Sequence, residues 1–244
     1  QQQYENSRDY IIPFVAHYLS QNKNLRICEV GSAEAGVLKA FIEQGHKGIG
    51  IELNGEKIKR AESFMADELK KGLVQFYHRD IHQISLKELG EGFDLIILKA
   101  VIENVHDQEA MLVRLKELLN EKGIIFIAMP PWRMPFGGHQ QMLSHKKLSK
   151  LPYFHLLPRG MYRKVMQWSK ERPEVIESQL EIKDTQISIN RFYRIVKKAG
   201  LQLVRRQFYL INPNYKYKFG LKPRKQLSII AAIPHLRDFF TTTA

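Results

Sequence analysis

Cysteine is almost absent from this chain: among 244 residues only Cys28 carries a thiol. A single thiol can form neither an internal disulfide nor a zinc-binding cysteine cluster. Cys28 lies within an apolar run, so we interpret it as a small buried hydrophobic residue and not as a nucleophile. No group of acids and histidines has the spacing of a metal site, and we expect no bound metal.

Long hydrophobic runs are missing too. The longest apolar stretches, 94–101 and 124–131, are far shorter than the roughly 20 residues that cross a bilayer. Residues 1–9 are polar and contain no apolar core followed by a cleavage site, so we expect a cytoplasmic protein. The apolar content of 44% and charged content of 26% are ordinary for a folded chain, and the length allows one large domain with a modest insertion.

Positive charge is concentrated in one region. The net charge is +13, and residues 141–225 carry 20 Lys and Arg against 5 Asp and Glu, whereas the rest carries 18 against 20. Such an excess indicates an anionic partner: a phosphorylated metabolite, a nucleic acid or a lipid head group. The alternative is a basic surface that is only solvated.

Short apolar runs alternate with amphipathic segments over the first 130 residues. After a leading helix at 8–19, within an N-terminal helical cover at 1–22, the pattern predicts strands at 25–30, 48–52, 73–78, 93–98 and 123–129. Helices are predicted between them at 35–44, 55–71, 85–90 and 105–120. This alternation is typical of the α/β class with a doubly wound, mostly parallel sheet.

The pattern breaks after Met129. Residues 130–139 (PPWRMPFGGH) can be neither a regular helix nor a central strand. Because 140–185 read as mostly helical, we interpret 130–187 as an inserted helical lid or acceptor region within one domain spanning 1–244. A basic helix at 188–199, a strand at 201–210, a loop at 212–225 and a final strand at 226–233 are predicted to follow.

The most informative motif is the run 27–36 (ICEVGSAEAG), followed by 48–52 (GIGIE). Small residues let a cofactor approach the backbone, and an acid at the next strand end can accept both hydrogens of a ribose diol. Gly31, Ala33 and Gly36 with Glu52 form a degenerate dinucleotide fingerprint, so a nicotinamide oxidoreductase is one interpretation. Glu29 favours another, because it would repel a pyrophosphate but could bind the amino group of a methionine moiety.

Together these features resemble the class I S-adenosylmethionine-dependent methyltransferases. The helix, strand, loop and strand at the chain's end are similar to that family's reversed terminal strand pair, which implies a seven-stranded sheet with an antiparallel last strand. The resemblance implies S-adenosylmethionine as the cofactor, bound by Glu29, Gly31, Ser32, Ala33, Gly36, Glu52, Leu53, Asp80, Ile81, Lys99 and Ala100.

The family's pattern assigns a role to each of these positions. It implies that Glu29 binds the methionine amino group and that Glu52 binds the ribose, with Leu53 beside the adenine. Asp80 and Ile81 would contact the adenine, while Lys99 and Ala100 would line the methionine end. Two departures are visible: Ala33 and Ala35 replace glycines common in the family, and 103–105 reads Glu-Asn-Val where many relatives have Glu-His-Val.

Some acceptors are excluded. No Asn/Asp-Pro-Pro-Tyr for adenine amine methylation follows the fourth predicted strand, Cys28 is misplaced for cytosine C5 chemistry, and Lys99 stands where a catechol-type magnesium site needs an acid. The segment 130–139 resembles one found in a sparsely characterised group of bacterial methyltransferases. We expect Trp132 and Phe136 to offer apolar walls to the substrate and His139 to serve as a catalytic base. The alternative is a structural loop in which His139 bonds to backbone.

The leading hypothesis is therefore a methyltransferase for a small, anionic metabolite, with Arg159, Arg163 and Lys164 either gripping the anion or only solvating their helix. The second is an RNA methyltransferase that uses the basic 141–225 surface and Tyr209, Tyr215 and Tyr217 to bind bases and phosphates. A third, of another class, is a non-catalytic protein that binds a partner through a nucleotide-binding fold.

Overall fold

The computed structural model describes residues 1–19 and 24–244, which form two compact units. Unit 1 comprises 1–101, 110–128 and 213–222; unit 2 comprises 102–109, 129–212 and 223–244. Within the described residues, no helix is long and apolar enough to cross a membrane. The expected N-terminal cover is helical over much of 2–15, whereas its residues 20–22 lie outside the described residues.

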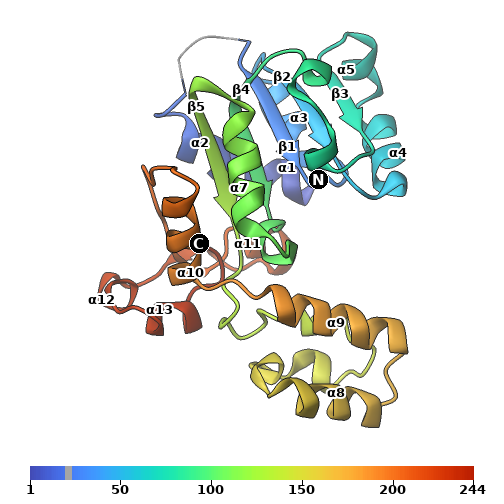
Figure 1. The fold of residues 1–244 in the computed structure, drawn as a ribbon, viewed down its shortest axis with the longest axis vertical. Coiled ribbons are helices and arrows are strands. Elements are labelled where there is room, and N and C mark those ends of the chain that lie inside the picture. Colours follow the sequence, from blue (N-terminus) through green and yellow to red (C-terminus); the bar gives the residue numbers. More distant parts are fainter. Residues whose placement is uncertain (20–23) are drawn as a thin grey trace. The chain divides into compact units, whose positions relative to one another are not determined.

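Unit 1 is built on five parallel strands (Figure 1): β1 (Arg26–Val30), β2 (Lys47–Ile51), β3 (Val74–Tyr77), β4 (Phe93–Lys99) and β5 (Leu119–Ala128). All five match strands predicted from the sequence, and β5 begins four residues earlier than expected. The strand order is β3-β2-β1-β4-β5, so the order reverses between β1 and β4. In open α/β sheets, ligands bind outside the carboxyl ends of the strands at such a reversal.

Helices follow the strands as the sequence predicted: α3 (Gly36–Ile42), α4 (Gly55–Phe64), α5 (Ala66–Lys70), α6 (Leu86–Leu89) and α7 (Gln108–Glu117). Leu38 and Phe41 of α3 are buried with Ile27 and Ile97 of the sheet in one hydrophobic core. Cys28 is buried in β1, and burial raises the pKa of its thiol. The prediction that Cys28 is buried is therefore confirmed.

The N-terminal segment of unit 1 consists of α1 (Gln2–Asn6), a π-helical turn (Ser7–Ile11) and α2 (Ile12–Val15). Helix α11 (Asn214–Phe219) packs on α1, and the Tyr217 hydroxyl donates to Asp9 at 2.5 Å. The sequence predicted only a loop at 212–225. The sequence does not predict this helix because its six residues, five of them aromatic or basic, carry too little hydrophobic periodicity.

Unit 2 is mainly helical, with α8 (Arg159–Trp168), α9 (Pro173–Thr185), α10 (Ile189–Lys198), α12 (Ser228–Ala232) and α13 (Leu236–Phe239). Helices α8 and α9 lie side by side (Figure 1) and bury Tyr162, Met166 and Leu180 between them. The predicted helical character of 140–185 and the helix at 188–199 are confirmed. The single-domain organisation and the lid role of 130–187 stay predictions.

The expected end of the sheet is different. Of the strand predicted at 201–210, only β6 (Tyr209–Ile211) is present; it pairs antiparallel with β7 (Arg224–Lys225) as a separate two-stranded sheet. The strand predicted at 226–233 is wrong, because 228–232 form helix α12. Leu203, Val204 and Ile229 are exposed, so these apolar residues have no buried face that would stabilise a strand. The parallel sheet thus has five strands, not seven, in the described structure.

Candidate functional site

The carboxyl ends of β1 and β2 carry the two acids that the sequence singled out. Glu29 of β1 lies beside Gly50 of β2 in the parallel register, and Glu52 follows β2 directly. The loop after β1 is anchored to β2, since the N–H groups of Gly31 and Ser32 both donate to the Ile51 carbonyl, at 2.8 and 3.2 Å. Both acids are therefore held at one edge of the sheet.

The loop between β1 and α3 requires unusual backbone angles. Gly31 has φ +71°, and a Cβ there would lie 2.4 Å from Val101 Cγ2. Ala33 and Ala35 also adopt left-handed conformations, with φ of 47° and 59°. Such angles are unfavourable for alanine by about 1–2 kcal/mol each, whereas glycine adopts them without that cost. The first motif is conformationally intact but strained.

Glu52 is nearly buried and binds this loop. One carboxylate oxygen accepts from Ala33 N–H and the other from Asn54 N–H, both at 3.0 Å. Each oxygen of a carboxylate can accept two hydrogen bonds, so each retains a lone pair for a ribose hydroxyl. Leu53 beside it is 69% exposed and offers the uncovered apolar surface that an adenine ring would need.

Glu29 is 4% exposed, and its carboxylate accepts from Leu38 N–H at 3.3 Å. Burial raises its pKa to about 8, while the positive charge of Lys99 opposes that rise. Burial likewise lowers the pKa of Lys99 to about 8, with Glu29 opposing the change. An acid and a base that share a poorly solvated edge suit a zwitterionic ligand, which supplies the opposite charge to each.

Helix α1 borders the strand end that the sequence assigned to the methionine part of the cofactor. The Lys99 ammonium donates to the Gln3 side chain, and a Cβ at Gly36 would lie 3.0 Å from Gln3 Cβ. Ala100, after β4, has φ 56°. The N-terminal helix thus packs directly on the loop and on the strand end that the sequence assigned to the cofactor.

Asp80 and Ile81 lie after β3. Asp80 caps a short 3₁₀ turn through a hydrogen bond from His82 N–H at 2.9 Å, and Ile81 is buried. Asp80 therefore has a structural role as a cap, which is the alternative to a role in binding adenine. The second carboxylate oxygen is the group available for an adenine amine.

An unpaired hydroxyl in the loop after β1 is a separate indication that these residues fit S-adenosylmethionine. The Ser32 hydroxyl is buried in the loop and has no hydrogen-bond partner among the described residues. Buried hydroxyls are normally paired, so an unpaired one within the cofactor loop suits a site that a polar ligand completes. Glu29 and Lys99 at the sheet edge and the remaining lone pairs of the Glu52 carboxylate add further polar groups. Together with the loop they can hold S-adenosylmethionine.

The acceptor residues proposed from the sequence belong to unit 2. His139 has φ 53°, its imidazole has no hydrogen-bond partner in the described part of the chain, and burial lowers its pKa. The lowered pKa favours the neutral imidazole, and among the described residues the ring makes no hydrogen bond to backbone; its role as a catalytic base stays a prediction. Phe136 is partly buried, whereas Trp132 is buried and lies edge-on against His155 at 4.6 Å between ring centroids.

The glycine pair before His139 has a packing explanation. A Cβ at Gly137 would lie 2.2 Å from the Trp132 carbonyl oxygen, and one at Gly138 would lie 2.2 Å from His155 Cβ. His155 is fully buried, with Nε2 2.6 Å from the Trp132 carbonyl oxygen. The pair therefore closes the loop on itself, and close approach of a ligand is not needed to explain it.

Both arginines considered for anion binding have partners. Arg159 pairs with Asp184 at 2.7 Å, and Arg163 pairs with Glu177 at 2.7 Å. A carboxylate already neutralises each guanidinium, so neither arginine is free to bind an anionic substrate. Other cations of the basic region are paired as well: Lys198 with Glu109 and Lys216 with Asp9.

Sequence reasoning overlooked Glu103. It noted the segment 103–105 only for its missing histidine, yet the Glu103 carboxyl is 5% exposed and both of its oxygens lack a hydrogen-bond partner within the described residues. Its position just after the fourth strand was the available signal, because acids at strand ends had already been singled out in Glu29 and Glu52.

The strand order β3-β2-β1-β4-β5, with its reversal between β1 and β4, defines a doubly wound α/β protein. Residues 21–200 match the family described as methyltransferase domains. The chain belongs to that family, and S-adenosylmethionine is its cofactor. No curated protein matches the chain.

Solved structures share the fold. A provisionally assigned sarcosine dimethylglycine methyltransferase from Galdieria sulphuraria is 12% identical, with a TM-score of 0.57 over 84% of this chain and 64% of that one. The plantazolicin methyltransferase BpumL, solved with S-adenosylhomocysteine, is 13% identical, with a TM-score of 0.51 over 81% of this chain and 64% of that one. At such identities the likeness concerns the fold alone. The chain spans about half to two thirds of the length of the solved methyltransferases it matches.

Proposed function

We propose that this protein is an S-adenosylmethionine-dependent methyltransferase whose acceptor is a small, anionic metabolite. The observation that carries the proposal is the pair of acids at neighbouring strand ends: Glu29, buried near Lys99, and Glu52, bonded to the loop after β1. An amino acid group and a ribose diol are the two parts of S-adenosylmethionine that such a pair would recognise.

Different residues of the chain bind the cofactor, bind the acceptor and remove its proton. Bound S-adenosylmethionine supplies a methyl group activated by a sulfonium. Glu29 binds its amino group and Glu52 its ribose, while Asp80 and Leu53 border the adenine. His139, unprotonated and unbonded, takes the acceptor's proton as general base, and Trp132 and Phe136 bind the acceptor's apolar part.

Calorimetry with S-adenosylhomocysteine tests the cofactor part. We expect micromolar binding in the wild type and none in Gly31→Arg, because any side chain at Gly31 meets Val101. Tighter binding of NAD than of S-adenosylhomocysteine would contradict the proposal and favour an oxidoreductase. Absence of binding to either would favour a non-catalytic protein.

Methyl-labelled S-adenosylmethionine and a deproteinised small-molecule extract of bacterial cells test the activity. We expect label transfer by the wild type and a loss of about 100-fold in His139→Gln, since a general base contributes roughly 10²–10⁴-fold. The matched control is His106→Gln. His106 is exposed and, within the part of the chain that the structure describes, pairs with Glu181, so this variant should transfer label like the wild type.

RNA is the second candidate acceptor, favoured by the excess of positive charge over 141–225. Phosphate contacts make affinity fall steeply with salt. Retention of RNA at low salt that weakens about 10³-fold between 50 and 200 mM salt would support it. No retention at low salt would exclude this acceptor.

A further inference from the structure

Glu103 is the least satisfied acid of the described structure. It lies in a 3₁₀ turn (Ile102–Asn104), four residues after the end of β4, and neither carboxyl oxygen has a hydrogen-bond partner among the described residues. An isolated buried carboxylate is strongly unfavourable, so the group is held as a neutral acid. Burial raises its pKa to about 8, in agreement with this state.

The backbone around Glu103 is fixed by side chains of unit 2. Thr185 Oγ1 donates to the Glu103 carbonyl at 2.7 Å, and Gln108 Nε2 donates to the carbonyls of Ile102 and Thr185, at 3.2 and 3.0 Å. Thr185 and Gln108 are themselves buried. The end of α9 therefore holds this turn by its backbone and leaves the acid unbonded.

A rigidly held, unbonded polar group calls for a partner. Buried polar groups in proteins are paired in the large majority, and an exception has a cause: local strain, a catalytic role, or a water, ion or ligand that completes its hydrogen bonding. The carboxyl edge of the sheet, after which Glu103 follows in the chain, is where open α/β folds bind their ligands. A neutral carboxylic acid offers one O–H donor and a carbonyl acceptor.

We propose that Glu103 is an acceptor-binding residue that, as a neutral carboxylic acid, donates a hydrogen bond to a carboxylate or phosphate oxygen of the methyl acceptor. This inference rests on the proposed function and names the chemistry of its substrate. A neutral donor suits an anionic acceptor, because an ionised acid at that position would repel it. Since the acid is closed to solvent, the acceptor reaches it only when the side chains that cover it move.

Two substitutions separate this role from others. Glu103→Gln keeps a neutral donor and acceptor of the same shape, so we expect label transfer to the cell extract within about threefold of the wild type. Glu103→Met keeps the volume but removes both groups, so we expect transfer to fall about 10- to 100-fold, the value of a lost hydrogen bond to a charged group. Equal loss in both variants would overturn the proposal in favour of an ionised acid, and full activity in Glu103→Met would overturn it outright.

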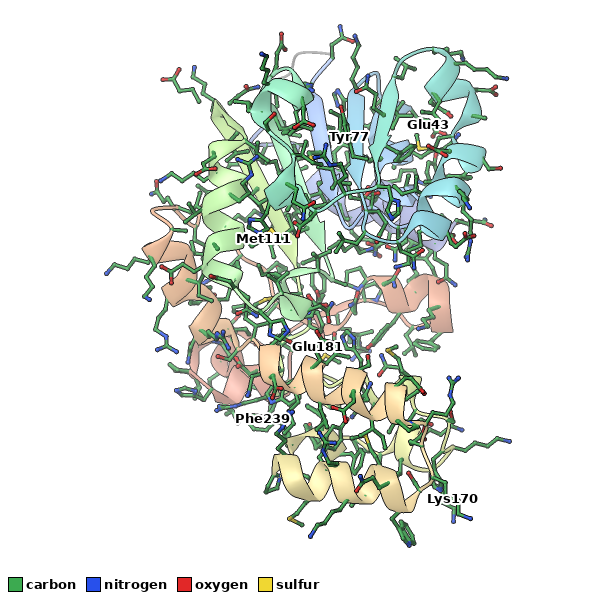
Figure 2. All side chains as sticks on the ribbon, turned by 45° about the vertical axis from the view of Figure 1, so that its right-hand side comes forward. Glu43, Tyr77, Met111, Lys170, Glu181 and Phe239 are labelled. Atoms are coloured by element: carbon green, nitrogen blue, oxygen red, sulfur yellow. The ribbon has the colours of Figure 1, made fainter. Side chains whose placement is uncertain are left out.

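Unfolding in urea gives a readout that needs no acceptor. Replacing an unpaired buried acid with an apolar side chain of similar shape is neutral or stabilising, so Glu103→Met should unfold at the same or a higher urea concentration than the wild type. A lower midpoint would reveal a structural partner and overturn the proposal. The control is Glu181→Met on α9, whose exposed side chain is labelled in Figure 2 and which should change neither measurement. Failure of the wild type to transfer label would instead overturn the proposed function.

Discussion

One oxygen of the Glu52 carboxylate accepts a hydrogen bond from the Ala33 N–H at 3.0 Å and so joins the end of β2 to the loop after β1. This bond places the acid's remaining lone pairs beside the loop that would receive the cofactor. The same acid therefore shapes the loop and, by our proposal, binds the ribose. Its removal should affect both.

We expect Glu52→Gln to weaken S-adenosylhomocysteine binding about 10- to 100-fold, because hydrogen bonds to a charged group contribute about 1.5–3 kcal/mol. Isothermal calorimetry at constant pH measures the change. Glu34→Gln is the matched control: Glu34 lies in the same loop but is exposed and paired with Arg60, and its loss should leave affinity unchanged. Equal affinities of wild type and Glu52→Gln would contradict a ribose-binding role.

The two left-handed alanines should respond differently to glycine. In Ala33→Gly the relief of backbone strain exceeds the added freedom of the unfolded chain, so the free energy of unfolding should rise by about 0.5–1 kcal/mol. Ala35 is fully buried, and loss of its methyl, at about 0.8 kcal/mol, should cancel the gain. Urea unfolding of both variants measures this. Ala66→Gly, in the exposed helix α5, should be destabilised, and a similar gain there would refute the strain argument.

The parallel sheet was predictable because its strands carry their own signal. Buried runs such as 93–98 are apolar on both faces and end in glycine or charge, which few other structures allow. The acids Glu29 and Glu52 were found for the same reason, since each stands where an apolar run ends. In this half of the chain the local hydrophobic pattern of a segment therefore predicts its position in the fold.

The hydrophobic pattern does not predict the structure where tertiary contacts determine the conformation of a segment. Residues 226–233 are apolar enough for a strand, yet Ser228–Ala232 form a helix with Ile229 exposed. The burial of Glu103 was equally hidden, because no local pattern reveals that a polar side chain will lack a partner. Both depend on which distant segments pack nearby, and a single sequence does not record that.

Glu29 should couple cofactor binding to protons. With its pKa raised to about 8 it is mostly protonated at pH 7, and binding an ammonium group requires the carboxylate. Binding of S-adenosylhomocysteine should therefore release a proton at pH 7, and affinity should rise from pH 6 to pH 8. Calorimetry in buffers of different ionisation enthalpy counts the protons. Glu29→Gln should bind more weakly and release none, whereas release undiminished in that variant would assign the proton to another group.

The same shift has a consequence for stability. Between its unfolded pKa near 4.5 and about 8, the folded protein retains a proton on Glu29 that the unfolded chain has released. Stability therefore falls as the pH rises through this window. Glu29→Gln should flatten this dependence in thermal unfolding at pH 5, 6, 7 and 8, and a slope identical to that of the wild type would show that Glu29 ionises normally.

The glycine pair before His139 can be tested by comparing two glycines of unit 2. In Gly138→Ala the new methyl would meet His155 Cβ at 2.2 Å in a fully packed loop, so we expect destabilisation by about 1–3 kcal/mol. Gly160 lies on α8, and beyond its chain neighbours and its own helical backbone no described atom lies within 4 Å of an added Cβ, so Gly160→Ala should stabilise by about 0.5–1 kcal/mol. Urea unfolding compares the two directly. If Gly138→Ala instead retained full stability and lost only label transfer, the pair would serve approach of the acceptor and not closure of the loop on His155.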